Sequence, residues 1–238
     1  MPYRKRVELV RLQRERAVDS VYQALRQAIV TYLIKPGERL NVEDLAGKLG
    51  VSLTPVRGAV QQLAAEGLVE IRPRSGTFVA NLSSRDVEET FRIRCALECL
   101  AARDGVEHIT AQQLRHLKDL LRALRKPVRG EEDRQAHERD NLELHRIIVR
   151  ASGNRRLIDM HEALNAHIAI ARIHAAEANW TRPRDEEAEH AAIVKSVEEG
   201  DGASLSAALQ RHIHRAKDAL VAALRQREER PPVDNRII

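Results

Sequence analysis

The sequence predicts a mainly α-helical protein, with a small domain of three helices and a β-hairpin followed by an antiparallel helical bundle. Aromatic residues make up only 3% of the chain, so the core must be built from Leu, Ile, Val and Ala, of which Leu and Ala favour helices. Strand-like segments are confined to residues 68–80, and from residue 83 onward apolar residues recur at helical spacing. These observations favour helices packed on helices for most of the chain.

The composition is typical of a soluble globular protein. The 238 residues suffice for one large domain or two ordinary ones, and they are 43% hydrophobic and 32% charged. No apolar run approaches the roughly 20 residues that cross a bilayer, and the basic N-terminus lacks the apolar stretch of a secretory signal. Cys95 and Cys99, one helical turn apart, are predicted to be reduced and packed. We therefore expect a cytoplasmic protein with no membrane partner.

The positive charge is confined to the N-terminal part of the chain. Residues 1–82 contain 13 Lys/Arg and 8 Asp/Glu, a net of +5, which equals the net charge of the whole chain. The remainder is neutral and contains all 10 histidines. The first part is therefore where a polyanion would bind, and the second holds the groups suited to metal or proton chemistry.

The N-terminal domain is predicted to contain three helices. Apolar residues at helical spacing predict the first over residues 17–34, and the sequence KPGERL then ends it. Asn41 is the N-cap of a short second helix, NVEDLAGKLG. After a very short turn, Ser52 or Thr54 caps a third helix, SLTPVRGAVQQLAAEG, with Pro55 in its first turn.

A β-hairpin follows the third helix. The segment LVEIRPRSGTFVA predicts two short strands around a tip at residues 72–76. Three helices and a hairpin in this order form a winged helix-turn-helix. In domains of this kind the second helix of the turn enters the major groove of DNA, and a basic hairpin reaches a neighbouring groove or the backbone.

From residue 83 onward the pattern predicts six helices and no strand. Ser83 or Ser84 caps the first of them, Thr110 caps the second, and Gly200-Asp201-Gly202 separates the last two. These pieces fit an antiparallel bundle. The predicted domains are a basic N-terminal arm (1–16), the winged helix-turn-helix (17–81), the all-helical domain (82–230) and a tail (231–238).

The third helix and the hairpin carry the residue types that contact DNA. The hydroxyls of Ser52 and Thr54, and the helix start at Thr54-Pro55, suit phosphate oxygens. Arg57, one turn further, can make a bidentate contact with a guanine edge. Arg72 and Arg74 on the hairpin are placed to meet phosphates or a minor groove. The alternative is that these are solvated charges on a small helical domain.

The segment KPGERLNVEDLAGKLGVSLTPVRGAVQQLAAEGLVEIRPRSGTFV resembles the winged-helix signature of GntR-type bacterial transcription regulators. The resemblance implies binding to double-stranded operator DNA, and it adds Gly76 of the hairpin to the DNA-binding set. This chain has Leu53 where the family usually has Arg, and Gly58 where it usually has an acidic residue. The loss of that arginine removes a base or phosphate contact.

A second group of polar residues lies in the all-helical part. Asn141 and His145 share a helix face with Leu144 and Ile148, so the chain directs an amide and an imidazole toward its core. His190 follows on the fifth helix of this domain and His212 on the sixth. Imidazoles that converge from different helices can hold a divalent cation. The alternative that this spacing leaves open is a set of packed core histidines bonded to the backbone.

The all-helical part resembles the FCD ligand-binding domain of FadR-type GntR regulators, through FRIRCALECLAA, NLELHRIIVRASGN and EEAEHAAIVKSVEEGDGASLSAALQRHI. By position, the resemblance implies that Asn141, His145, His190 and His212 ligate Zn, Ni or Mn. The family's usual first ligand is an aspartate, and the neutral amide of Asn141 is a weaker one. Arg94 is the candidate for an effector carboxylate, and its alternative role is to pair with Glu98 one turn on.

Together these patterns predict a homodimeric repressor whose affinity for a palindromic operator responds to a small organic acid, with or without a metal. Two alternatives remain. In one, the helical domain only dimerises. In the other, the histidines hold a catalytic metal with Glu186, Glu187 or Glu189 as base, but that hypothesis leaves the N-terminal domain unexplained. We therefore expect no enzyme.

Overall fold

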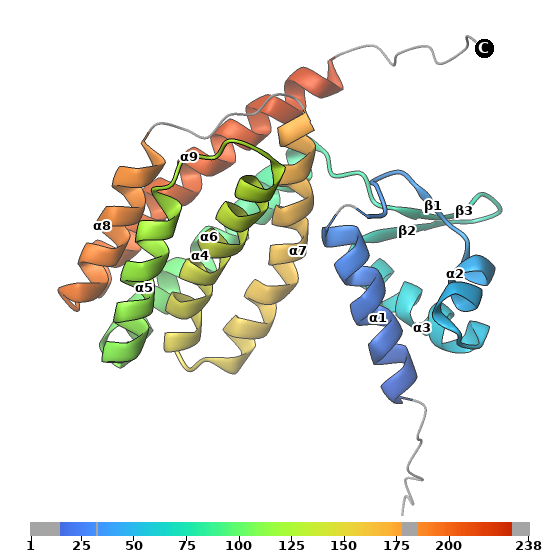
Figure 1. Ribbon diagram of the computed structural model, residues 1–238, viewed down its shortest axis with the longest axis horizontal. Coiled ribbons are helices and arrows are strands. Elements are labelled where there is room, and N and C mark those ends of the chain that lie inside the picture. Colours follow the sequence, from blue (N-terminus) through green and yellow to red (C-terminus); the bar gives the residue numbers. More distant parts are fainter. Residues whose placement is uncertain (1–14, 32, 178–184, 230–238) are drawn as a thin grey trace, which may run out of the picture. The chain divides into compact units, whose positions relative to one another are not determined.

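The computed structural model describes residues 15–31, 33–177 and 185–229 (Figure 1). The predicted tail, 231–238, lies outside the described residues, as does the predicted basic arm up to residue 14. Contacts divide the chain into two compact units, with the boundary between Asn81 and Leu82. Each unit is described by itself.

The first unit contains three helices and a small sheet. The helices are α1 (Glu15–Val30), α2 (Val42–Leu49) and α3 (Leu53–Ala65). The strands are β1 (Arg39–Leu40), β2 (Val69–Arg72) and β3 (Gly76–Val79), in the antiparallel order β1-β3-β2. The winged helix-turn-helix is thus confirmed. Strand β1 was not predicted, because two residues are too short to show an alternating pattern.

Helix α1 ends four residues before the predicted boundary of 34. Thr31 caps the end, since its hydroxyl donates to the carbonyl of Gln27 at 2.8 Å, and the amide of Ile34 bonds to the carbonyl of Ala28. The apolar spacing misled the prediction at Leu33, whose side chain is 79% exposed and contributes nothing to the core. Helix α2 ends as predicted, at a Gly50 with φ +64°.

The core of the first unit joins α1 to α3. Val21, Leu25 and Ile29 are buried on one face of α1, at the spacing of an amphipathic helix. Helix α3 packs against α1 and buries Val56, Ala59, Val60 and Leu63. This packing holds the opposite side of α3 at the surface.

The second unit is a bundle of helices. They are α4 (Ser84–Gly105), a short 3-10 helix η1 (Val106–His108), α5 (Ala111–Leu124), α6 (Glu131–Ala151), α7 (Arg155–Glu177), α8 (Glu186–Glu198) and α9 (Gly202–Glu228). Helix α4 packs along α9 and also contacts α6 and α7. Ser83 and Thr110 cap α4 and α5 through capping boxes with Asp86 and Gln113.

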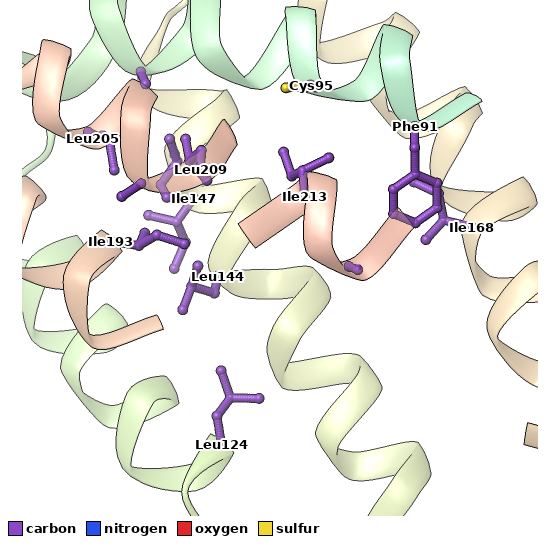
Figure 2. Packing of buried hydrophobic residues seen from close by; sticks show 14 of the residues in the cluster. Phe91, Cys95, Leu124, Leu144, Ile147, Ile168, Ile193, Leu205, Leu209 and Ile213 are labelled. Atoms are coloured by element: carbon purple, nitrogen blue, oxygen red, sulfur yellow. The ribbon is translucent and has the colours of Figure 1, made fainter. Parts of the chain in front are cut away.

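The bundle core is aliphatic over much of its length, as the scarcity of aromatic residues predicts. Figure 2 shows Leu144 and Ile147 of α6 beside Ile193 of α8, with Leu209 of α9 close by. Cys95 is buried in the same cluster, and its Sγ lies 3.9 Å from that of Cys99, so both thiols are free. Among the described residues, no helix is long and apolar enough to cross a membrane.

We predict that Gly105→Ala destabilises the helical unit. A Cβ at Gly105 would lie 2.5 Å from the amide nitrogen of Ser152 and 2.6 Å from the carbonyl carbon of Ala151, and this backbone cannot yield easily. The free energy of unfolding should fall by about 1–3 kcal/mol. The measurement is urea unfolding followed by circular dichroism.

Gly47→Ala is the matched control for this prediction. Gly47 lies inside α2, and no atom lies within 4 Å of the added Cβ. The change should therefore be neutral or stabilise by up to about 1 kcal/mol. Equal unfolding midpoints for the Gly105 variant and the wild type would contradict the close packing of α4 against the end of α6.

DNA-reading surface and buried histidine cluster

The N-terminal end of α3 presents polar groups to solvent. Ser52 is the N-cap residue, but its hydroxyl makes no capping hydrogen bond. Ser52, Thr54 and Arg57 are exposed, and Arg57 forms no ion pair within the described part of the chain. The hydroxyls and the guanidinium therefore lie on one accessible end of the helix, where sequence reasoning placed them.

Two residues at the start of α3, Pro55 and Leu53, offer no polar side chain for a contact with DNA. Pro55 was predicted to contribute to DNA binding, but its ring is buried and it has no N–H, so its role is to hold the first turn of the helix. Leu53 is 37% exposed and occupies the surface position that the resemblance associates with arginine. The reading end of α3 is therefore less basic than the resemblance implies.

The hairpin between β2 and β3 forms the wing, and its two predicted arginines differ. Arg72 donates to Glu70 Oε2 from Nε (3.0 Å) and Nη2 (2.8 Å), and its guanidinium lies 4.7 Å from the ring centre of Phe78. Arg74 is exposed at the tip with φ +64°, a conformation that non-glycine residues rarely adopt. The charge of Arg74 is therefore presented to solvent, whereas that of Arg72 is largely neutralised.

Gly76 shapes the wing rather than presenting a contacting side chain. Its φ is +123°, and a Cβ there would lie 2.9 Å from Nε of Arg39. Arg39, on the unpredicted strand β1, is an exposed cation that sequence reasoning missed. Its pairing opposite Phe78 brings it onto the wing, and only a prediction of β1 would have found it.

The three predicted histidines converge inside the helical unit. His145 of α6, His190 of α8 and His212 of α9 are fully buried, and one ring nitrogen from each lies within 4.8 Å of the others. The rings of His145 and His212 are stacked with centres 5.2 Å apart, and those of His190 and His212 are 4.6 Å apart. The structure therefore brings together residues that are 67 positions apart in the sequence.

Two carboxylates, the buried Glu98 and the partly buried Glu189, orient two of these imidazoles. His145 Nδ1 lies 2.5 Å from Glu98 Oε2, and His212 Nδ1 lies 2.9 Å from Glu189 Oε2. Each Nδ1–H donates to its carboxylate, so each Nε2 carries the lone pair. Both Nε2 atoms are buried and have no hydrogen-bond partner among the described residues. This is the arrangement that a cation-binding imidazole requires.

The imidazoles are held neutral. Burial lowers the pKa of His145 to about 3, against the opposing effect of the Glu98 charge. Burial likewise lowers the pKa of His190 and of His212. Neutral rings can ligate a metal without first losing a proton, so the cluster is suited to bind a divalent cation near neutral pH.

Asn141 links His190 to a buried arginine of α7. One atom of its amide lies 2.8 Å from His190 Nε2, and the other lies 2.8 and 3.0 Å from Nη1 and Nη2 of Arg172. Only one orientation satisfies both neighbours, with the amide nitrogen donating to the imidazole and the amide oxygen accepting from the guanidinium. Asn141 therefore lies at the cluster as predicted, but its oxygen faces Arg172.

Arg94, the predicted effector contact, is paired within the protein. Its Nε donates to Glu98 Oε1 at 2.5 Å, and both side chains are buried. Glu98 also accepts from Nε2 of His161 at 3.0 Å. Although burial raises the pKa of Glu98, Arg94, His145 and His161 together hold it well below the usual range. The pairing alternative is therefore realised, and it places Arg94 beside the cluster.

Sequence reasoning missed Arg172 and the central position of Glu98. Arg172 is buried in α7 and donates to Glu138 of α6. The sequence did contain a signal for Arg172, because it places a charged residue within the largely apolar stretch HIAIARI, on the buried face of a helix. Its partner on another helix leaves no comparable sequence pattern.

A winged helix-turn-helix joined to an all-helical unit with a buried polar cluster defines a transcription regulator, not an enzyme. Residues 17–79 match the description "Bacterial regulatory proteins, gntR family", and residues 89–215 match the FCD domain. The chain therefore belongs to the GntR family of bacterial transcription regulators with an FCD domain.

Individual relatives agree with this assignment. The chain is 34% identical over 153 residues to the uncharacterized HTH-type transcriptional regulator YdhC of Bacillus subtilis, covering 64% of this chain and 68% of that protein. It is 32% identical over 206 residues to a probable D-xylose utilization operon transcriptional repressor of Paenarthrobacter nicotinovorans, covering 85% and 88%. The solved structure of Escherichia coli McbR/YncC matches with a TM-score of 0.72 at 25% identity, covering 90% and 99%.

We predict that Arg57→Ala weakens specific operator binding by about 5- to 150-fold, because a bidentate contact with a base is worth about 1–3 kcal/mol. The operator would first be selected from a random duplex pool, and affinity would be measured by fluorescence anisotropy at fixed salt. Gln62→Ala is the control, since Gln62 is exposed further along α3. Equal losses in both variants would contradict the reading role of Arg57.

Proposed function

We propose that the protein is a homodimeric repressor of the FadR-type branch. It binds a palindromic operator, and its operator affinity is changed by a small carboxylate bound with a divalent metal in the helical unit. The observation that carries the proposal is the convergence of three buried, neutral imidazoles, two of which direct an unpartnered Nε2 lone pair toward the cluster. A merely structural histidine would use both ring nitrogens, since an unmatched buried polar atom costs about 1–3 kcal/mol.

The chemistry of the donors supports a borderline divalent cation. The three imidazoles, of His145, His190 and His212, offer nitrogen ligands for the predicted metals Zn, Ni or Mn. Two of the rings are held by carboxylates, those of Glu98 and Glu189. When bound, the metal would supply a positive centre for a carboxylate. Arg94 and Arg172 are cationic side chains next to the same cluster.

Apolar side chains exposed on α4 support the proposed dimer. Ile93 and Leu100 are 49% and 46% exposed and lie seven residues apart, on one stripe of the helix. Burying these side chains against a second copy would pair two reading helices about a two-fold axis. That symmetry matches two half-sites of a palindromic operator.

The alternative enzymatic hypothesis has no free base to support it. Glu189 is held by His212 and Arg215, and although burial raises its pKa, the hydrogen bonds from these two residues lower it to about 2. Glu187 pairs with Arg125 at 3.0 Å. Glu186 lies 3.6 Å from His137. These carboxylates act as partners for basic groups rather than as activators of water.

We predict that chelator-free wild-type protein takes up about one equivalent of Ni²⁺ or Zn²⁺ per chain and that His145→Ala abolishes this uptake, because it removes one of the three nitrogen ligands. Equilibrium dialysis followed by elemental analysis measures the bound metal. His214→Ala is the matched control, because His214 is exposed on the same helix as His212. Equal metal content in the His145 variant and the wild type would contradict the site.

The regulatory proposal is tested on DNA. Metal-loaded wild-type protein should change its operator affinity by about 5- to 150-fold when the correct member of a panel of small carboxylates is added. His145→Ala should bind the operator as the unliganded wild type does and should not respond. A helical domain that only dimerises would give no response to any carboxylate in the wild type, and that result would reject the proposal.

A further inference from the structure

The amide of Asn141 has one oxygen and two neighbours that compete for it. In the structure this oxygen accepts from Nη1 and Nη2 of Arg172, at 2.8 and 3.0 Å, while the amide nitrogen donates to His190 Nε2. Both residues are buried, with Arg172 9% exposed and Asn141 1% exposed, so each depends mainly on partners within the protein. In this orientation the amide provides a hydrogen-bond partner both for the Arg172 guanidinium and for His190 Nε2.

Binding a cation at His190 breaks this arrangement, whichever ring nitrogen is used. If Nε2 ligates the metal, the amide N–H groups of Asn141 point at the cation and must turn away. If Nδ1 ligates it, then Nε2 carries the hydrogen of the neutral ring and needs an acceptor in place of the amide nitrogen. In both cases the amide must turn its oxygen from Arg172 toward the cluster.

When the amide turns, Arg172 loses the Asn141 oxygen as a hydrogen-bond acceptor. The amide nitrogen, a donor, then faces two guanidinium donors in the protein interior, and Glu138 remains the acceptor on Nη1. An unsatisfied buried charged donor is among the more costly defects in a protein. A carboxylate is the group that removes it, because its two oxygens accept from a guanidinium in bidentate fashion.

We propose that Asn141 makes metal binding conditional on an anion, so that the cation and a small carboxylate held by Arg172 bind cooperatively. The inference rests on the metal part of the proposed function and assigns Arg172, rather than Arg94, as the carboxylate contact. Both arginines are paired with a glutamate, but Arg172 is the one that donates to the amide oxygen of Asn141, whereas Arg94 donates to Glu98 at 2.5 Å. Metal alone then binds weakly, and the regulator responds when both are present.

An aspartate at position 141 would remove the conflict. A carboxylate offers one oxygen to the cluster and the other to Arg172, so no donor loses its acceptor when a cation binds. The Asn141→Asp variant is therefore the sharpest test, because it replaces the amide nitrogen by an oxygen and adds a negative charge while it keeps the shape of the side chain. It should bind metal without help from an anion.

The experiment titrates full-length protein with Ni²⁺ against a chromophoric chelator, which reports the free metal, in either sodium acetate or sodium chloride at equal ionic strength. In the wild type, acetate should raise the apparent Ni²⁺ affinity at least about fivefold, and by linkage Ni²⁺ should raise the acetate affinity equally. In Asn141→Asp, the affinity in chloride should match or exceed that of the wild type in acetate, and the acetate effect should fall below about twofold.

Two further variants complete the test. Asp140→Asn, which alters charge on the adjacent and differently directed residue, should keep the acetate effect of the wild type. Arg172→Gln, used if its circular dichroism is native, should bind Ni²⁺ without an acetate effect. Wild-type Ni²⁺ affinity that is equal in acetate and chloride would overturn this inference and leave the proposed metal site intact. An acetate effect that persists in Asn141→Asp would overturn it as well. No Ni²⁺ binding in either salt would reject both the inference and the metal part of the proposed function.

Discussion

The buried carboxylate of Glu98 is the interaction on which the helical unit depends. A charge with no exposure to solvent is tolerated only when it is paired and hydrogen-bonded, and Glu98 meets this condition through three helices. Arg94 belongs to its own helix, His145 to α6 and His161 to α7. Because one carboxylate must satisfy all three, the helices are fixed in register at this level of the bundle, and the interior there cannot be apolar.

The layer of the bundle that contains Glu98 and the three clustered histidines determines which groups the site can bind. Glu98 fixes the tautomer of His145, and Glu189 does the same for His212 from the opposite end of the cluster. A lone pair on each ring is thereby directed inward and left without a partner. The rest of the core is largely aliphatic, and Figure 2 shows this packing around Leu144 and Ile193, so the folding free energy is supplied by ordinary packing. The bundle can therefore hold a few unmatched polar atoms for binding.

The sequence was informative where a signal lies within one segment. Helical periodicity, the Asn41 cap and the glycine ends predicted the helices, and the resemblance in NLELH predicted that His145 enters the cluster. Contacts between segments that are far apart in the chain could not be predicted from the sequence. Strand β1 exists only because Arg39 and Leu40 pair with β3, and the role of Asn141 depends on Arg172 across the helix interface. The burial of Pro55 could not be predicted, because a proline at a helix start has the same sequence signature whether it is buried or exposed.

Part of the positive charge of the DNA-reading unit is neutralised within the unit itself. Glu70 neutralises Arg72, Glu66 lies 4.0 Å from Arg26, and an exposed Leu53 stands at the start of α3. Arg39, Arg57 and Arg74 remain exposed on α3 and the wing, and they are the cations available to phosphates there. Coupling between effector and DNA is typically about 1–3 kcal/mol, which changes affinity by only about 5- to 150-fold. A change of that size in affinity vacates an operator only when the operator is not far from half-occupied. A strongly basic surface would raise the affinity and keep the operator occupied in both states.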